Sequence, residues 1–466
     1  MKKRIVILIF LLITAAILYS CISDGQTPED TAPSFSPAGT VPLNLPDERA
    51  AEPAKGSMPA LSISTDRNIG DNYVRAEMSL SYINPAITRD YRAQIRVRGA
   101  NSRSYEKRSF KIRLDDSYNL LDIMSRNTGN KHYVLIAMWN DYTLMRNPMG
   151  FELMKQLEGI PLSPNYTYVE VYFDGVYEGV YLLVEDIRVD ENRVNINDKN
   201  PGDTNSFLVS SAPGREIQLN YSPGYNGGYY GARDDKTFGS MRIRSQIHNQ
   251  QQLDFIQNIL NRAWASIPDK TAAEQRFDIA SLVDVYIAAE IMKGLDIAWN
   301  NHFWMHYDEP TDKVYFTTLW DLKFGGGNHS GHNGFWASWE GLGMIAPQGQ
   351  WGQFNRWFIY LMMQTWFREL VQERFAEIDD VLDSIVPFLR DTYKLHRAGF
   401  ERNFARWPHG NIGYDSNFTP RQVVALKSHE ENADYLVNWM EHRVSWLRAY
   451  LGSAEFISHA GTDNPG

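Results

Sequence analysis

The chain has 466 residues, of which 43% are hydrophobic and 22% charged, and its 46 basic and 56 acidic side chains give a formal net charge of −10. This balance is typical of a folded globular protein and excludes a mainly disordered or mainly membrane-embedded chain. An acidic surface repels phosphate backbones at long range, so we expect no nucleic-acid partner. Cys21 is the single cysteine, which excludes an intrachain disulfide and a cysteine-ligated zinc site.

Residues 1–20 are predicted to be a lipoprotein signal peptide. Lys2, Lys3 and Arg4 precede an uncharged apolar run over 5–19, which is shorter than the ~20 residues of a membrane-spanning helix. Cys21 follows a small residue in a pattern that resembles a bacterial lipobox, so we expect it to be lipidated, in an exported lipoprotein anchored to a membrane of a bacterial cell envelope. An N-terminal anchor helix with an incidental cysteine is the alternative. Residues 21–57, rich in Pro, Ser, Thr, Ala and Gly, are predicted to be a flexible linker.

Two segments of the next part alternate apolar and polar side chains, as half-buried strands do. They cover 91–98 and 108–114, and a small polar loop over 99–107 joins them. The side chains expected to face inward are Tyr91, Ala93, Ile95, Val97, Phe110, Ile112 and Leu114. Lys111 is expected on the opposite face of its strand.

A helix and a hairpin are predicted to follow. Leu144, Phe151, Met154 and Leu157 are spaced for one side of a helix over 141–158, and Pro148 favours an irregular first turn or a start near residue 147. Strands over 168–173 and 176–184 flank an Asp-Gly pair at 174–175, which is a strong hairpin signal.

The remaining chain is mainly helical in pattern. Residues 200–240 are expected to be an irregular insertion, and one β segment is predicted over 302–322. The predicted helices cover 251–267, 279–294, 354–393 and 421–451. The sequence therefore predicts an α+β fold with a strand-rich N-terminal lobe (about 58–190), a helix-rich C-terminal lobe (about 240–455) and a tail over 456–466, with the site in a cleft between the lobes.

A set of polar residues suits phosphoryl transfer. Asp296 and Asn301 have the spacing Asp-x4-Asn, and Asp321 ends an apolar strand just before a glycine run. A carboxylate must accept the proton of the attacking hydroxyl, a carboxylate and an amide oxygen must hold Mg²⁺, and an ammonium such as that of Lys111 must neutralise phosphate oxygens. The order of these residues matches that of protein kinases, although a G-x-G-x-x-G loop and a His-Arg pair before Asp296 are missing.

Further motifs run over most of the chain. They are Arg98-Gly-Ala-Asn-Ser102, Ser109-Phe-Lys-Ile-Arg-Leu114, Leu144-Met-Arg-Asn147 and the segments 175–185, 296–304, 319–322 and 439–447. Together they carry a resemblance to the CotH kinase family, the spore coat protein H-like proteins. It implies a bilobal, atypical protein-kinase-like fold. The implied activity is transfer of the γ-phosphoryl group of ATP to Ser or Thr hydroxyls of an envelope or surface protein, with Mg²⁺ or Mn²⁺ as the metal.

The same resemblance implies roles for single residues. Asp296 would be the catalytic base, and Asp321 and Asn301 the metal ligands. Lys111 would contact phosphate, and Glu152 would pair with Lys111 by analogy. The remaining cofactor-binding positions implied by the motifs are Arg98, Asn101 and Ser102.

Other functions stay open at this point. The family usually has an acid two residues after the metal aspartate, and Lys323 stands there instead. Together with export to a place with little ATP, this favours the alternative of an exported pseudokinase or scaffold that binds an envelope component without catalysis. Asp296, Asp321 and Lys323 also imitate the Asp…Asp-x-Lys set of metal-dependent nucleases, and a glycan-cleaving pair of carboxylates is a further alternative.

Histidines and aromatic residues offer two more interpretations. His302, His306, His329 and His332 are candidates for a zinc or iron site, but strand spacing places the first two about 13 Å apart. A loop around the last two is the simpler interpretation. The aromatic residues of 335–339, with Trp351 and Trp357, could stack sugars, but packing in the core is expected.

Overall fold

The computed structural model describes residues 58–82, 87–99, 101–121, 129–198, 206–211, 229–230, 241–299, 303–331, 334–344, 356–408 and 419–458. The predicted signal peptide, Cys21 and the predicted linker lie outside these residues. Asn301, His302 and His332 also lie outside them, so the expectations for these side chains stay predictions.

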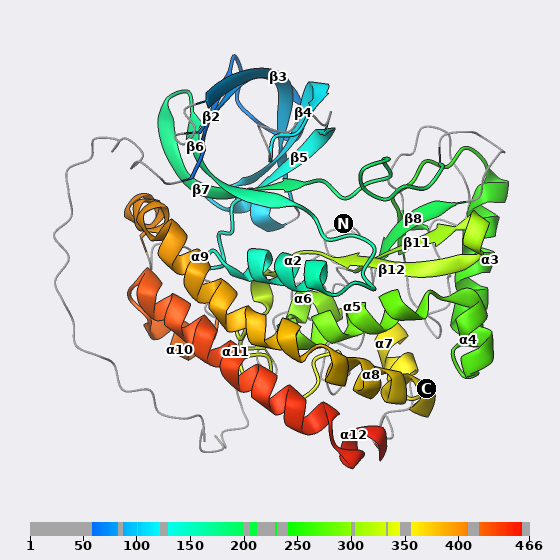
Figure 1. Cartoon of the computed structure of the whole chain (residues 1–466). Coiled ribbons are helices and arrows are strands. Elements are labelled where there is room, and N and C mark those ends of the chain that lie inside the picture. Colours follow the sequence, from blue (N-terminus) through cyan, green and yellow to red (C-terminus); the bar gives the residue numbers. More distant parts are fainter. Residues whose placement is uncertain are drawn as a thin grey trace, which may run out of the picture. The chain divides into compact units, whose positions relative to one another are not determined.

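The N-terminal part of the described chain forms a closed barrel of seven strands (Figure 1). Around the barrel the strands follow the order β1-β2-β3-β4-β5-β7-β6. Neighbouring strands are antiparallel, except that β1 and β6 pair in parallel and close the barrel, which leaves no free edge. The strands are β1 (Ala60–Thr65), β2 (Val74–Tyr82), β3 (Ile87–Arg98), β4 (Ser109–Tyr118), β5 (Asn130–Ile136), β6 (Tyr166–Phe173) and β7 (Val176–Glu185).

The barrel interior is filled by the alternating apolar side chains that the sequence predicts. All seven side chains expected to face inward from β3 and β4 are buried. Ile95 and Ile112 are cross-strand partners, and so are Arg96 and Lys111 on the other face. The predicted placement of Lys111, opposite the barrel core, is therefore confirmed.

The predicted hairpin is confirmed as β6 and β7. Asp174 and Gly175 join the strands with φ angles of 48° and 83°. Two consecutive left-handed residues match the right-handed twist of a hairpin, which explains the Asp-Gly pair.

A second sheet, of five strands within the described residues, lies in the C-terminal part. Its order is β12-β11-β8-β10-β9, with β11 (Phe303–Asp308) and β12 (Lys313–Leu319) at the predicted β segment. The expectation of an irregular insertion over 200–240 needs correction, because β8 (Phe207–Ser211) and β9 (Tyr229–Tyr230) fall inside it and β10 (Met241–Ile243) follows it. β8 pairs with both β10 and β11, and β9 pairs with β10, so these strands belong to the sheet.

Helices cover most of the other described residues after 245. They are α3 (Gln250–Ser266), α4 (Lys270–Arg276), α5 (Ile279–Met292), α6 (Leu295–Trp299), α7 (Arg356–Met362), α8 (Thr365–Glu377), α9 (Asp379–Arg406), α10 (Arg421–Ala425), α11 (His429–Leu451) and α12 (Ala454–Ser458). α5 is buried at every position from Ser281 to Met292 and packs on β12. α12 reaches into the expected tail, and its Phe456 is buried.

The helix between the barrel strands is α2 (Arg146–Gln156). It starts five residues after the first residue of the range 141–158 and confirms the alternative start near residue 147. Leu144, expected on its apolar side, precedes the helix with a left-handed φ of 58°. The segment before α2 is instead a turn, in which the Asp141 carboxylate accepts hydrogen bonds from the backbone N–H groups of Thr143 and Arg146. α2 packs against α5, α9 and the short helix η3 (Leu322–Phe324).

α9 ties the helices to the barrel at β7. The amide oxygen of Asn403 accepts hydrogen bonds from the N–H of Val180 (3.0 Å) and from the ammonium of Lys107 (2.8 Å). Arg402 pairs with the buried carboxylate of Glu170 at 2.8 Å. Polar contacts of this kind fix the direction of α9, and through it the position of α2.

The predicted fold class is thus confirmed at the level of a mixed α+β protein with a strand-rich N-terminal part and a helix-rich C-terminal part. Among the described residues, none of the helices combines the length and the apolar character that a membrane crossing requires.

Candidate active site

Asp296 lies in the first turn of α6, directly after the buried helix α5. α5 ends at Lys293, whose φ of 43° is left-handed. The Lys293 ammonium donates to the carbonyl oxygens of Phe335 (2.7 Å) and Ser338 (2.8 Å) and to that of Glu340. Burial lowers the pKa of Lys293 to about 6. These contacts fix the end of α5 and therefore the start of α6.

Asp321 lies two residues beyond β12 and has left-handed backbone angles, φ 64° and ψ 54°. Such a conformation is uncommon for a residue with a side chain, and aspartate is among those that adopt it most readily. The N–H of the next residue, Leu322, donates to the side-chain oxygen of Asn147 on α2 at 3.0 Å. The buried Asn147 thus holds the turn that presents Asp321.

The two aspartates converge on one ammonium group. The Nζ atom of Lys323 lies 3.1 Å from Oδ2 of Asp296 and 2.8 Å from Oδ1 of Asp321. The three side chains are only 20%, 11% and 31% exposed, in the order Lys323, Asp296, Asp321. Asp296 precedes β11 and β12 in the sequence and Asp321 follows them. Their carboxylates nevertheless form one half-buried cluster with Lys323.

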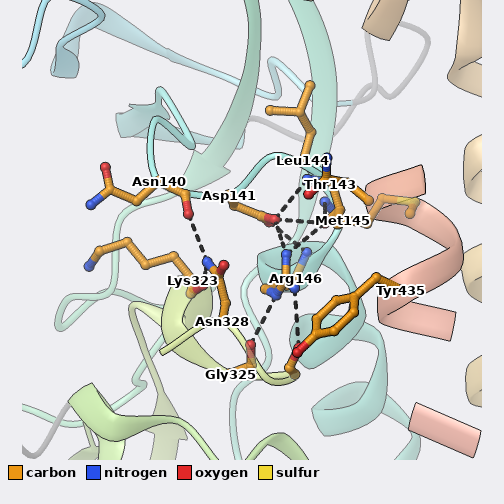
Figure 2. A network of polar contacts seen from close by, with 12 residues as sticks. Asn140, Asp141, Thr143, Leu144, Met145, Arg146, Lys323, Gly325, Asn328 and Tyr435 are labelled. Atoms are coloured by element: carbon orange, nitrogen blue, oxygen red, sulfur yellow. Dashed lines mark hydrogen bonds and ion pairs between the residues drawn. The ribbon is translucent and has the colours of Figure 1, made fainter. Parts of the chain in front are cut away.

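A buried arginine holds the glycine run after Asp321. The guanidinium of Arg146 donates to the carbonyl oxygens of Gly325 (2.9 Å) and Gly326 (3.1 Å) and pairs with Asp141 at 2.6 Å (Figure 2). Gly326 and Gly327 have φ angles of 56° and 72°, which glycine adopts without strain. The run is therefore fixed from the side of α2.

Asn328 closes the same segment. Its side-chain amide donates to the carbonyl oxygens of Asn140 (2.7 Å) and Lys323 (2.8 Å), as Figure 2 shows. The backbone of Lys323 is thus tied to the turn before α2, while its ammonium contacts the two aspartates.

A comparison with protein-family models matches residues 95–447 to the family described as CotH kinase protein. The chain belongs to the CotH kinase family. The motif resemblance is confirmed, and membership indicates a protein-kinase-like function. No curated protein matches the chain. The match favours phosphoryl transfer over the nuclease alternative, although the three residues of that alternative do converge at Lys323.

Lys111 of this CotH chain pairs with an acid that the sequence did not indicate. Its Nζ atom lies 2.9 and 2.7 Å from the two carboxylate oxygens of Asp186, which directly follows β7. Glu152 forms no ion pair with Lys111 among the described contacts. It lies on α2 beside Lys155, at 4.0 Å, and hydrogen-bonds with Tyr166. The expected Lys111–Glu152 pair is therefore wrong, because β5 and β7 bring Asp186 next to β4 while α2 points Glu152 toward β6.

Several cations surround the Lys111–Asp186 pair. Burial alone would raise the pKa of Asp186, but the positive charges of Lys111, Arg98 and Arg188 outweigh it and lower the pKa. The pKa of Lys111 is lowered, mainly by burial and also by the charges of Arg98 and Arg244, although Asp186 opposes this shift. Lys111, Arg98, Arg188 and Arg244 form a basic cluster near Asp186.

Two arginines of the basic cluster contact tryptophan rings. The guanidinium of Arg98 lies 5.6 Å from the ring centre of Trp320, the residue before Asp321. The guanidinium of Arg244 lies 4.5 Å from that of Trp304 on β11. Arg98 of the basic cluster thus lies next to the segment that carries Asp321.

The loop with the other predicted cofactor positions follows β3. Asn101 and Ser102 lie in the short helix η1 (Asn101–Ser104). Gly99 precedes it with a φ of 112°, and a Cβ atom there would lie 1.9 Å from the Ser102 hydroxyl oxygen. Glycine at this position therefore lets Ser102 fold back against the strand end.

The donor types suit a divalent ion only in part. Asp296 and Asp321 offer the carboxylate oxygens that Mg²⁺ and Mn²⁺ prefer, but the cation that these oxygens contact is Lys323. Asn301, the expected third ligand, lies outside the described residues. Within the described part of the chain, no three His, Cys, Asp or Glu side chains form a group able to hold a metal.

The described histidines are engaged in packing. His306 stacks on Tyr315 at 4.7 Å, and its Nδ1 atom is 2.9 Å from the Thr317 hydroxyl. His329 is buried, and its Nδ1 atom accepts a hydrogen bond from the N–H of Gly331. The expected packing of the aromatic residues is confirmed for Trp336 and Trp357, which are fully buried.

Sequence reasoning identified Asp296 and Asp321 but not the groups that position them. Arg146 and Asn147 stand in a motif that carried the family resemblance, so the sequence marked these two residues. It did not indicate that Arg146 contacts the glycine run or that Asn147 contacts Leu322. Asp186 had only a weak signal, an acid at the end of a strand. Lys293 had none, because its partners are backbone carbonyls distant in the sequence.

Proposed function

We propose that this chain is a CotH-type protein kinase that transfers the γ-phosphoryl group of ATP to a Ser or Thr hydroxyl of an envelope or surface protein. Family membership supports a kinase-like activity. The observation that carries the proposal is the convergence of Asp296 and Asp321 on one ammonium, since phosphoryl transfer needs a proton acceptor beside the groups that orient the phosphates.

Each residue has a proposed role in this transfer. The Asp296 carboxylate would accept the proton of the hydroxyl as its oxygen forms a bond to the γ-phosphorus and the bond to ADP breaks. A divalent ion bound with the nucleotide, through Asp321 and Asn301, would neutralise phosphate charge. The basic cluster supports an anion site beside them, with Lys111 and Arg98 as phosphate contacts. Asn101 and Ser102 are proposed cofactor positions from the resemblance alone.

Transfer from γ-labelled ATP tests this function directly. The substitution Asp296→Asn keeps the size of the side chain and removes the proton acceptor, so we expect labelling of the protein itself or of a Ser-rich peptide to fall roughly 100- to 10,000-fold. The matched control is Asp90→Asn, at an exposed position of β3, which should keep the wild-type rate. Full transfer by the folded Asp296→Asn variant would remove Asp296 as the base.

A pseudokinase or scaffold is the second candidate, and Lys323 is the observation that favours it. Its ammonium already contacts both carboxylates that catalysis and metal binding would use. In this case the folded protein would show no rise in melting temperature with ATP and any divalent ion. A rise with ATP that depends on Mg²⁺ or Mn²⁺ would count against it.

The barrel and the helical part are proposed to correspond to the two lobes of a bilobal, atypical protein-kinase-like fold. Lys111 lies on a barrel strand, whereas Asp296 and Asp321 lie in the helical part, and this is the division of roles in kinases. We further propose a lipid anchor at Cys21 and a place in a bacterial cell envelope. Incorporation of a labelled fatty acid that is lost in Cys21→Ser would support this location.

A further inference from the structure

The cluster of Asp296, Asp321 and Lys323 already contains a cation. The Lys323 ammonium bridges one oxygen of each carboxylate, at 3.1 and 2.8 Å. Two carboxylates this close to one point repel each other unless a positive charge lies between them. The Lys323 ammonium therefore offsets negative charge of the two carboxylates. Without Lys323, a metal ion would have to offset that charge.

Lys323 is fixed in this position by its surroundings. Its ammonium lies 4.6 Å from the ring centre of Phe324, and its carbonyl oxygen accepts a hydrogen bond from Asn328 at 2.8 Å. The carboxylates of Asp296 and Asp321 contact this ammonium from two sides and stabilise its positive charge.

A divalent ion that used the same two oxygens would need the space of this ammonium. Mg²⁺ and Mn²⁺ bind oxygen at about 2.0–2.2 Å, which is closer than the ammonium approaches either carboxylate. Both cations cannot lie between the same two oxygens.

We propose that Lys323 is the resident cation of this site and that a divalent ion competes with its ammonium for Asp296 and Asp321. Lys323 is then a residue that sets how tightly the site binds metal. The inference deepens the proposed function, because it concerns the same two carboxylates in the protein without nucleotide. Its test needs no nucleotide.

The test is a titration of the full chain with Mn²⁺ at pH 7 without nucleotide, with free Mn²⁺ measured by electron paramagnetic resonance. In Lys323→Met the charge is removed at nearly constant length, so Mn²⁺ affinity should rise roughly tenfold or more. Lys323→Arg keeps the charge and should show no such gain. Lys394→Met, at an exposed position of α9, should match the wild type.

Unchanged or weaker Mn²⁺ binding by folded Lys323→Met would overturn the proposal. Where that variant does not fold, Lys323→Gln gives the same test, because it keeps a hydrogen-bond donor and removes the positive charge. A gain in Lys323→Met that persists when Asp296→Asn is added would also overturn it, since the ion would then lie elsewhere. Absence of ATP binding by the folded wild type, with the Mn²⁺ gain of Lys323→Met intact, would contradict the kinase proposal and leave this inference standing.

Discussion

Two basic side chains control the segment that carries Asp321. Lys323 contacts both aspartates, and Arg146 holds the carbonyl oxygens of Gly325 and Gly326. The partner of Arg146 is Asp141, and the two side chains are only 1% and 0% exposed. Water cannot replace either partner at such burial, so loss of one partner leaves an uncompensated charge in the interior.

The substitution Arg146→Met should therefore be strongly destabilising. We expect the free energy of unfolding, measured in urea, to fall by about 3–5 kcal/mol, because Asp141 loses its guanidinium and the glycine run loses two donors. The matched control is Arg390→Met, since Arg390 pairs with Glu441 at 2.9 Å while both side chains are well exposed; this change should cost about 1 kcal/mol or less. Equal losses in the two variants would show that burial of the Arg146 pair is not what stabilises the turn.

At the level of elements, α11 supports the turn before α2 through His429. The Nε2 atom of His429 lies 2.9 Å from the carbonyl oxygen of Thr143, and the ring stacks on Tyr393 at 5.3 Å. Among the described residues the buried Nδ1 atom has no hydrogen-bond partner, so a proton there would be buried without an acceptor. Burial lowers the pKa of His429 to about 4.

This lowered pKa predicts a loss of stability in mild acid. The unfolded chain binds the proton near pH 6.5 and the folded chain only near pH 4, so the stabilising contribution is complete above pH 6.5 and is lost as pH falls toward 4. Between pH 7.5 and pH 5.0, His429 should account for about 2 kcal/mol of the decrease in unfolding free energy.

Urea unfolding at the two pH values measures this contribution. His429→Gln should show a smaller acid-induced decrease than the wild type, by about that amount. His442→Gln, an exposed position on the same helix, should behave like the wild type. An equal decrease in His429→Gln and the wild type would place the acid sensitivity in other groups.

At the scale of the molecule, separate segments build the candidate site because each is fixed by a different packing partner. The buried helix α5 sets the start of α6 and so Asp296, while β12 and α2 set Asp321. The barrel contributes Lys111, and α9 ties the barrel to the helices through Asn403. The acidic cluster thus depends on contacts between elements rather than on one local motif.

Much of this architecture could be predicted because local patterns determine it. The alternating strands β3 and β4 and the Asp-Gly hairpin follow from side-chain period and turn chemistry, and the order of Asp296 and Asp321 in the chain pointed to one site. Pro148 favoured a helix start near residue 147, and α2 starts at Arg146. The left-handed conformation of Leu144 could not be predicted, because its side chain does not favour it.

The predictions that were wrong concern features that depend on contacts between residues distant in the sequence. β8 lies in a segment rich in glycine and tyrosine, and it pairs with β11 and β10, which are distant from it in the sequence. Lys111 pairs with Asp186 rather than Glu152, since the register of β4, β5 and β7 brings Asp186 to it. Neither pairing leaves a periodic signal in the sequence.

Calorimetric titration with ATP and Mg²⁺ tests most directly whether Asp296 and Asp321 organise a nucleotide site. Asp321→Asn keeps an oxygen that can accept a hydrogen bond from Lys323 and removes the charge. We predict that the wild type and the exposed control Asp90→Asn bind ATP equally, and that Asp321→Asn binds at least about tenfold more weakly. Equal binding by Asp321→Asn, or no binding by the folded wild type, would contradict the account.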